Sequence, residues 1–284
     1  MAKEFFINPI LAFLSVLLLE GVFFYNYTTP EFNVNISQLP FWALSIYFTW
    51  RCKKNNKFED YFLLGLFIGL GILSKYLFLY LVTGIYLYLF YQFFYEKKKN
   101  LNKILITSLI SILIISPHIY WLINNNFETI AYGLRRAEGI GNFFDHIFFP
   151  VTFILKQIGL LIPFFIIFFS LTKNFKLKTI KKNEKNIFLF FTFLTPILLI
   201  IFTSTIMGVK IRTMWMTPFY LFFGVFFVYI FKPQINLKKI NTFLSGFLFL
   251  FFLSPVLYSY ISISQTEKRT DYPGKEIAKK TQEI

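Results

Sequence analysis

Long apolar stretches recur along the chain, and one of them is long enough for two membrane crossings. It reads YFLLGLFIGLGILSKYLFLYLVTGIYLYLFYQFFY from Tyr61 to Tyr95 and contains a single charged residue, Lys75. A helix needs about 20 apolar residues to cross a bilayer. Gly71 and Ser74 weaken the helix just before the lysine, so the pattern predicts a helical hairpin over Phe58–Tyr95 that turns at Ser74–Lys75. Because a charge in hydrocarbon is costly, Lys75 is expected at the membrane surface or in a wet cavity.

Nine apolar segments can be drawn along the whole chain, and the second and third of them are short. They are Phe5–Tyr25, Ile36–Trp50, Phe58–Leu73, Tyr76–Tyr95, Ile104–Ile123, Ile147–Leu171, Ile187–Met207, Thr213–Phe231 and Phe243–Ile263. The pattern predicts an all-α, polytopic membrane helix bundle with about nine transmembrane helices and no sizeable soluble domain. We expect the bundle to cover residues 1–263 and a short extracytoplasmic tail to cover 264–284. The Gly65-x-x-x-Gly69 spacing indicates close helix packing.

Composition supports a membrane protein and excludes some other classes. Hydrophobic residues make up 56% of the chain and charged residues only 15%, whereas about a quarter of a soluble domain is charged. A formal charge of +15 would suggest nucleic acid as the partner of a soluble chain, but membrane topology explains it better, so no nucleic-acid partner is expected. One Cys and two His cannot assemble a Cys/His zinc cluster.

The distribution of Lys and Arg among the loops predicts the orientation. When the N-terminus is placed in the cytoplasm, every inner loop is basic and most cations fall on the inner side, as the positive-inside rule requires. We interpret the inner lysines only as charges that keep the inner loops in the cytoplasm. The protein is then integral to the plasma (inner) membrane, and its C-terminus is extracytoplasmic. The outer side holds Lys75 and the loops Asn26–Asn35 and Asn124–His146.

Two outer residues, Glu31 and Lys75, each allow a structural and a functional interpretation. Glu31 lies just before the second apolar segment, where an acid suits the helix dipole; alternatively, its carboxylate faces an extracytoplasmic cavity as a base or a cation ligand. Lys75 is either an interfacial lysine that snorkels or a clamp for the phosphate of a lipid carrier.

The largest outer loop, NNNFETIAYGLRRAEGIGNFFDH, carries two adjacent arginines. Arg135, Arg136 and Glu138 form either an ordinary solvated loop with an Arg–Glu pair or a guanidinium fork that recognises phosphate. Arginines on the translocated side run against the positive-inside trend, which draws attention to them.

Other polar residues interrupt the apolar segments. His118 reads first as a hydrogen-bonded core histidine. Lys156 and Gln157 lie well inside the sixth segment, where such residues usually face a bundle interior or a cavity. Lys210 and Arg212 follow the seventh segment and fit the flanking cations of a membrane interface. Together these residues predict an extracytoplasmic site for an anionic ligand, without specifying a reaction.

Several stretches, taken in order, resemble the integral-membrane glycosyltransferases of the GT-C class, in particular the branch with the protein O-mannosyltransferases and the lipid A aminoarabinose transferases. The stretches are TTPEFNVNISQLPFWAL, FEDYFLLGLFIGLGILSKYLFLYL, SPHIYWLINNNFETIAYGLRR, ILKQIGLLIPFF and VKIRTMWMTPFYLF. The resemblance covers nearly the whole chain.

The resemblance implies transfer of a sugar from a polyprenyl-phosphate donor to an extracytoplasmic acceptor, which is a lipid, a glycan or a protein. It implies that Lys75, Arg135 and Arg136 contact the lipid phosphate and that Glu31 is a catalytic carboxylate in the cavity. We expect the cavity to be lined further by His118, Glu138, Gln157 and Arg212. A divalent cation is a candidate cofactor, but no metal-ligand residues are assigned.

One departure from the family pattern concerns catalysis. Members of the family carry an acidic pair in a first outer loop, and this sequence has no Asp-Glu pair. The chain thus resembles an N-terminally truncated member, expected to bind polyprenyl phosphate but to transfer little sugar alone. Two alternatives stay open: a carrier or flippase for an anionic lipid or solute, and a non-catalytic membrane partner. A transporter is expected to have two halves with similar sequence patterns and polar residues near the bilayer midplane. We find no such pair of halves in the sequence, and only Lys156–Gln157 approaches the middle of the bilayer.

Overall fold

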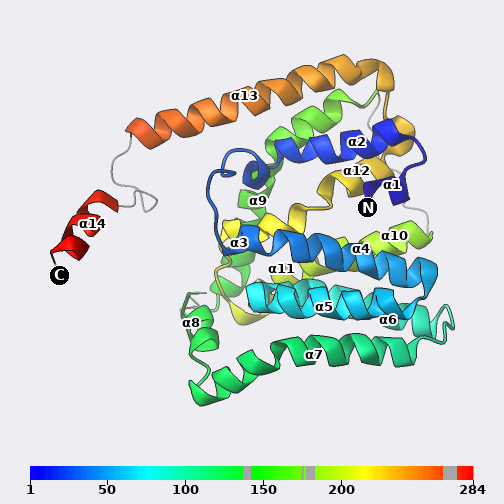
Figure 1. The fold of residues 1–284 in the computed structure, drawn as a ribbon. Helices are drawn as coiled ribbons and strands as arrows, with labels where there is room; N and C mark the ends of the chain where they lie inside the picture. The colour runs from blue at the N-terminus through cyan, green and yellow to red at the C-terminus, as the bar shows by residue number, and fades with distance from the viewer. Residues whose placement is uncertain (137–141, 174–175, 177–182, 265–273, 284) are drawn as a thin grey trace.

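The computed structural model describes residues 1–136, 142–173, 176, 183–264 and 274–283 (Figure 1). The α-helices are α1 (Ala2–Phe5), α2 (Pro9–Leu17), α3 (Val34–Ser37), α4 (Leu39–Asn55), α5 (Phe58–Ser74), α6 (Leu79–Phe94), α7 (Leu101–Asn124), α8 (Glu128–Arg136), α9 (Asp145–Ser170), α10 (Glu184–Leu189), α11 (Thr195–Met207), α12 (Phe223–Ile230), α13 (Ile240–Ser264) and α14 (Gly274–Gln282). Shorter turns of helix link them: η1 (Leu18–Gly21), η2 (Phe23–Tyr25), η3 (Tyr76–Phe78), η4 (Phe190–Leu194), η5 (Thr213–Tyr220), η6 (Lys232–Gln234) and η7 (Leu237–Lys239).

The predicted all-α membrane bundle is confirmed, and helix occupies each of the nine predicted apolar segments. Within the described residues, five helices are long and apolar enough to cross a membrane, or up to six if the bent pair Thr213–Tyr220 and Phe223–Ile230 forms one span. The predicted count of nine is not confirmed, because α4 and α5 have 17 residues each and fall short of about 20.

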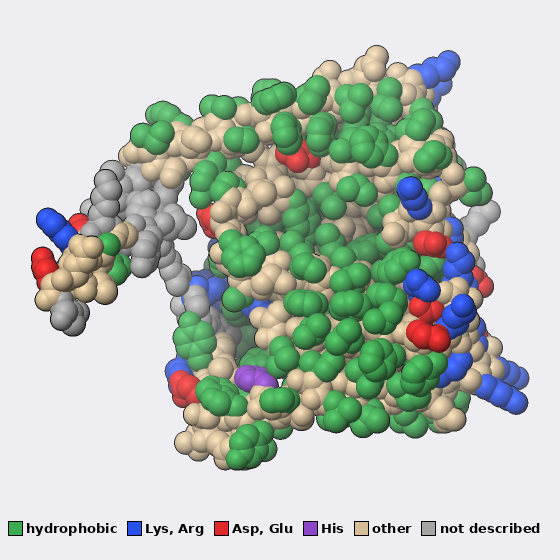
Figure 2. Space-filling view, in the orientation of Figure 1, with side chains coloured by type: hydrophobic (Ala, Val, Ile, Leu, Met, Phe, Trp, Pro, Cys, Tyr) green, Lys and Arg blue, Asp and Glu red, His purple; other side chains and the backbone are tan. Residues whose placement is uncertain are grey.

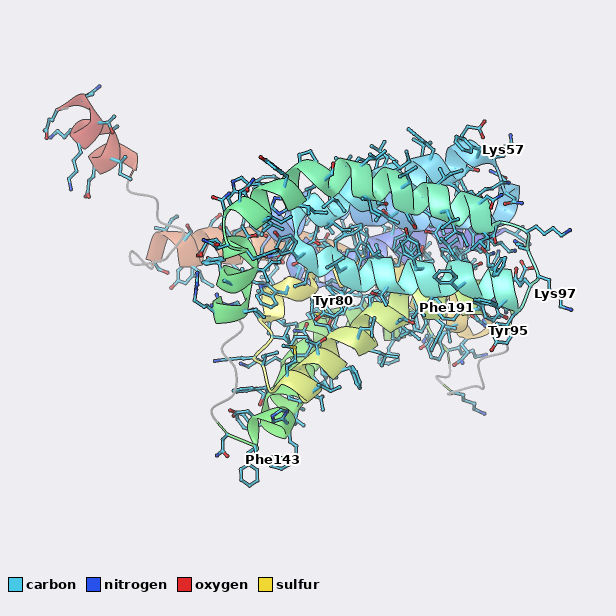
Figure 3. All side chains as sticks on the ribbon, turned by 90° about the horizontal axis from the view of Figure 1, so that it is seen from below. Lys57, Tyr80, Tyr95, Lys97, Phe143 and Phe191 are labelled. Atoms are coloured by element: carbon cyan, nitrogen blue, oxygen red, sulfur yellow. The ribbon has the colours of Figure 1, made fainter. Side chains whose placement is uncertain are left out.

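The long helices run between two ends of the molecule. Lys57 and Lys97 lie at one end, here called the basic end, and Phe143 lies at the opposite end (Figure 3). Lys and Arg side chains gather at the basic end, and the surface between the ends is largely hydrophobic (Figure 2). Lys75 follows the last turn of α5 and lies away from the basic end. The assignment of the basic end to the cytoplasm stays a prediction.

Glycines allow α5 to approach α7 closely. A Cβ on Gly65 would lie 2.6 Å from the Thr107 carbonyl oxygen, and one on Gly69 would lie 2.8 Å from Ile114 Cβ. Ser111 Oγ donates to the Gly65 carbonyl oxygen over 3.0 Å. The close packing predicted from Gly65-x-x-x-Gly69 is therefore confirmed, and it fixes the helix that ends at Lys75.

A π-helical turn, η4, joins α10 to α11. Such turns widen the helix and displace a backbone group from its usual partner. Gly84 of α6 packs against the carbonyl of Phe191 in this turn, and Thr192 Oγ1 donates to the Phe188 carbonyl oxygen over 2.8 Å. The turn thus brings α6 and α11 together beside the groove described below.

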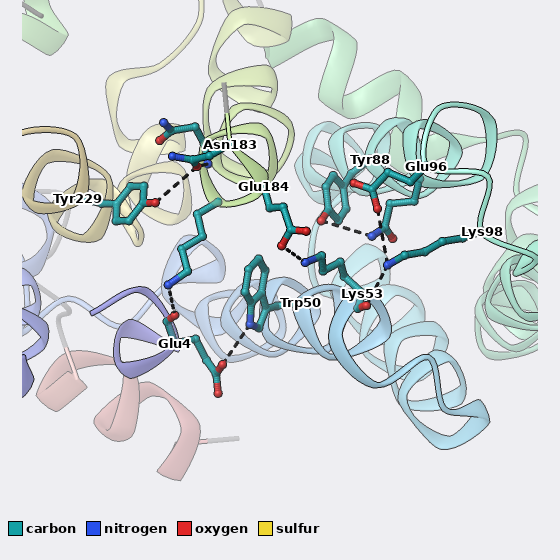
Figure 4. Close-up of polar contacts among 12 residues, drawn as sticks. Glu4, Trp50, Lys53, Tyr88, Glu96, Lys98, Asn183, Glu184 and Tyr229 are labelled. Carbon is teal, nitrogen blue, oxygen red and sulfur yellow. Dashed lines mark hydrogen bonds and ion pairs between the residues drawn. The ribbon is translucent and has the colours of Figure 1, made fainter. Parts of the chain in front are cut away.

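Ionic contacts tie the helix ends together at the basic end (Figure 4). Lys53 pairs with Glu184 of α10. Lys54 Nζ lies 3.1 Å from a Glu4 carboxylate oxygen, and Lys185 Nζ donates to the Glu4 carbonyl oxygen over 2.6 Å. The interpretation of the inner lysines only as charges that keep the loops in the cytoplasm was therefore incomplete, because these lysines also join α1, α4 and α10.

Candidate functional site

Lys75 is held at the break between α5 and η3. Its backbone is extended, and its N–H donates to the Gly71 carbonyl oxygen over 3.2 Å. The half-buried side chain donates through Nζ to Oδ1 of Asn35. Nζ also lies 5.2 Å from the centroid of the Trp215 ring. The predicted hairpin turn is confirmed, and packing against an amide and an indole face fixes the position of the ammonium group.

The loop before α4 supplies the amide that meets Lys75. Asn35 is only 3% exposed, and its N–H donates to Oδ1 of Asn33, which caps α3, over 2.8 Å. Glu31 lies on the same loop with a half-buried side chain. Its N–H donates to the Thr28 carbonyl oxygen over 3.0 Å, and its own carbonyl oxygen accepts from Asn33 Nδ2 over 3.3 Å. Glu31 therefore lies four residues before Asn35, whose side-chain amide oxygen accepts a hydrogen bond from Lys75 Nζ.

A polar chain links the residue after Lys75 to two further elements. The Tyr76 hydroxyl lies 2.5 Å from Nε2 of His118 in α7 and 2.7 Å from Oγ1 of Thr129 in α8. The His118 ring stacks on Trp121 with 5.8 Å between the ring centroids. His118 is therefore hydrogen-bonded, as expected, and its partner belongs to the turn that carries Lys75.

The largest outer loop contains an amphipathic helix, α8. Arg135 Nη2 lies 2.5 Å from Glu128 Oε1, and both side chains are 62% exposed. An Arg–Glu pair was one of the two interpretations of this loop. Arg136 is the last residue of α8, and Glu138 lies outside the described residues. A hydrogen bond between Thr129 and Tyr76 joins α8 to the surroundings of Lys75.

An apolar groove adjoins the Lys75 turn. It has a volume of about 400 Å³ and is lined by Tyr76, Leu77, Leu79, Tyr80, Thr83, Leu199, Phe202 and Thr203. The Tyr80 hydroxyl donates to Thr203 Oγ1 over 2.9 Å and so joins α6 to α11. Figure 3 shows where Tyr80 lies on α6. Tyr76 lines this groove and directly follows Lys75 in the chain, although Lys75 itself is not a lining residue.

A second and larger cleft, of about 590 Å³, is lined by three cations. Its residues are Phe148, Phe149, Thr152, Phe153, Lys156, Lys210, Ile211, Arg212, Thr213 and Met214. Lys156 comes from α9, and Lys210 and Arg212 come from the segment between α11 and η5. Arg212 therefore lines a cleft, but neither Lys75 nor Glu31 is among the lining residues of that cleft.

Gln157 takes a structural position beside this cleft. It is 6% exposed, and its Oε1 accepts from the Tyr220 hydroxyl over 2.9 Å. It does not belong to the lining of either cleft described above. Within the described residues, no group of three or more His, Cys, Asp or Glu side chains is placed to hold a metal ion.

Residues 1–121 match the model of a family described as dolichyl-phosphate-mannose-protein mannosyltransferase. The resemblance to GT-C membrane glycosyltransferases is confirmed. The matched region contains Glu31, Lys75 and His118, whereas Arg135, Gln157 and Arg212 lie beyond it. No curated protein and no solved structure was found to match the chain.

The sequence analysis did not predict the roles of four residues at these sites. Asn35 and Tyr76 were not singled out as functional, although each directly contacts or adjoins a predicted residue. Lys156 and Lys210 were noted separately, but their meeting in one cleft was not foreseen. Lys156 gave a signal as a charge inside an apolar run, whereas Asn35 lies among other polar residues and gave none. The partner that each residue meets depends on helix packing.

Proposed function

We propose that this chain binds a polyprenyl-phosphate sugar at the Lys75 turn and serves in transfer of the sugar to an extracytoplasmic acceptor. The observation that carries the proposal is a fixed cation, Lys75, directly before Tyr76, which lines an apolar groove. The family match over residues 1–121 supports this class of donor.

The donor has two chemically different parts, and the turn offers a surface for each. The phosphate lies against the Lys75 ammonium, which Asn35 and Trp215 hold in place. The isoprenoid chain follows the groove between α6 and α11, where Leu79 and Phe202 supply apolar walls. A compact ammonium suits a phosphate as a point charge, and burial of apolar groups in the groove adds affinity.

The transfer step needs both a stabilised leaving group and a proton acceptor. The bond between the anomeric carbon and the phosphate oxygen breaks, the acceptor oxygen bonds to that carbon, and the hydroxyl proton passes to a base. Fixed positive charge at Lys75 stabilises the departing phosphate, most effectively where water is partly excluded. We assign the base to Glu31, because a carboxylate can take this proton and Glu31 shares a loop with Asn35. Arg135 and Arg136 on α8 are proposed as outer phosphate contacts.

A binding measurement tests the clamp without requiring turnover. The purified chain is reconstituted in nanodiscs, and its affinity for a fluorescent polyprenyl phosphate is measured by titration. Lys75→Ala removes the ammonium and should weaken binding about tenfold or more, the size of a lost charge-assisted hydrogen bond of roughly 1.5–3 kcal/mol. Arg135→Ala should also weaken binding, but less, because Arg135 is exposed and paired with Glu128.

Two controls make the result interpretable. Lys57→Ala removes one exposed cation at the basic end and should leave the affinity unchanged. Lys75→Arg keeps the charge and should retain much of the binding. Equal affinity of the Lys75→Ala variant and the unmodified chain would exclude the clamp.

A further inference from the structure

The cleft between α9 and the segment 209–214 is separate from the groove beside Tyr76, and its side chains have a distinct chemical character. Lys156, Lys210 and Arg212 supply its charge, and Thr152 and Thr213 supply hydroxyl groups. Three phenylalanines, Ile211 and Met214 complete the lining. Among the residues that the structure describes, the lining contains no carboxylate, and Asp145 of α9 does not belong to it. The cleft therefore favours an anion that also carries apolar groups.

Contacts outside the cleft hold its two walls in place. His146 Nδ1 lies 2.9 Å from the Thr205 carbonyl oxygen and joins the start of α9 to the end of α11. Gly208 ends α11 with φ 57°, in the left-handed region, and Ser204 Oγ donates to the Val209 carbonyl oxygen over 2.8 Å. Ile211 is only 8% exposed and anchors the segment between the two cations. The positions of Lys210 and Arg212 are therefore set by the fold.

The apolar wall of the cleft continues onto the outer face of α9. Phe148 lines the cleft and is 62% exposed. Ile147, Val151 and Leu155 on the same helix are also exposed, and α9 is one of the helices long and apolar enough to cross a membrane. In a helix that crosses a membrane such residues face lipid, so acyl chains can reach the apolar edge of the cleft at Phe148.

We propose that this cleft is a second binding site, for a lipid with a phosphate headgroup that carries no compensating cation. The arginine guanidinium and the two ammonium groups bind the phosphate oxygens, while Phe148 and Met214 contact the start of the acyl chains. A zwitterionic headgroup is disfavoured, because its own cation meets three positive charges. The inference does not rest on the donor site, since Lys75, Asn35 and Trp215 are not among the residues that line this cleft.

The site also has a structural connection to Lys75. Arg212 precedes η5, and its carbonyl oxygen accepts from the Trp215 N–H over 3.0 Å. The Trp215 ring centroid lies 5.2 Å from Lys75 Nζ. A lipid in the cleft therefore lies against the segment that completes the Lys75 site, and two phosphate-bearing lipids can approach that segment from different sides.

Photolabelling can locate the bound lipid. The chain is reconstituted in phosphatidylcholine vesicles that contain a trace of phosphatidic acid with a diazirine in the acyl chain near the headgroup. After irradiation, labelled peptides are identified by mass spectrometry. We expect labels within 147–156 and 209–214, displaced by added dioleoyl phosphatidic acid but not by added phosphatidylcholine or inorganic phosphate.

Variants decide whether the cations cause the labelling. Lys156→Ala and Arg212→Ala should each raise the concentration of phosphatidic acid needed for displacement about tenfold, whereas Lys156→Arg should stay close to the unmodified chain. Lys57→Ala is the matched control for loss of one surface cation, and a thermal melt of each variant checks folding. Labelling elsewhere, unchanged displacement in both alanine variants, or equal displacement by phosphatidylcholine would overturn the proposal. Displacement by inorganic phosphate would show that the cleft recognises the anion without the lipid.

Discussion

The role of a residue depends partly on its own type and place in the sequence and partly on the residues that it contacts in the folded protein. Lys75 could be singled out because it is the one charge in a long apolar run. Its partners could not, because Asn35 and Trp215 come from distant segments. Glycines also differ in a way that only the structure shows. Gly65 and Gly84 permit the close approach of a neighbouring helix, whereas a Cβ added at Gly159 in α9 would meet no atom within 4 Å.

This contrast gives a prediction for two matched substitutions. Gly84→Ala places a methyl group against the backbone carbonyl of Phe191 in the π-helical turn, so the helices must separate, at a cost of about 1–3 kcal/mol. Gly159→Ala meets no neighbour within 4 Å and should be neutral or stabilising by up to about 1 kcal/mol. Apparent melting temperatures of the two variants in detergent, followed by tryptophan fluorescence, test this. A lower value for Gly159→Ala than for Gly84→Ala would contradict the packing described here.

At the scale of elements, short helices depend on contacts with longer ones. The helix α1 has only four residues, so it has little stability of its own. Glu4 connects it to α4 by accepting hydrogen bonds from Lys54 over 3.1 Å and from the Trp50 indole over 3.2 Å. The Lys54 hydrogen bond, followed by that from Trp50, lowers the pKa of the Glu4 carboxyl below its ordinary value of 4.5.

The lowered pKa predicts a pH dependence with a definite sign. Because the folded protein holds Glu4 ionised, the contribution of these contacts is present above pH 4.5 and is lost as the pH falls through the lower folded-state pKa. Apparent melting temperatures measured from neutral pH downward should therefore fall more steeply for the unmodified chain than for Glu4→Gln, which lacks the ionised group throughout. Glu59→Gln removes an exposed acid at the same end and serves as the control. Parallel pH profiles of the unmodified chain and Glu4→Gln would contradict the assignment.

The whole molecule has two chemically different ends. The basic end carries Lys57 and Lys97 (Figure 3), while the opposite end carries the Lys75 turn, α8 and the cation-lined cleft. By the positive-inside rule, the end that carries the excess of Lys and Arg is expected to stay in the cytoplasm. We therefore predict that the end with the proposed ligand-binding features faces the extracytoplasmic side.

Cysteine labelling tests this orientation directly. Cys52 is buried, and Cys52→Ser provides a background without native thiols. In intact cells, a membrane-impermeant maleimide should label Arg135→Cys, whereas Lys57→Cys should react only after the membrane is permeabilised. Both positions are exposed in the structure, so a lack of labelling cannot be attributed to burial. Labelling of Lys57→Cys from outside would reverse the topology and place the proposed donor site on the cytoplasmic side.

The sequence by itself determined the class of the molecule, the hairpin break and the cation at that break. These features follow from local patterns, because runs of apolar residues set helix length in a bilayer and an isolated charge must avoid hydrocarbon. It also predicted the close approach of α5 through Gly65-x-x-x-Gly69. Only the tertiary structure decided that Asn35 and Trp215 surround Lys75, that Tyr76 meets His118 and Thr129, and that Lys156 shares a cleft with Arg212. Such meetings depend on how helices distant in the chain pack, bend and unwind, and no local period along the chain encodes that arrangement.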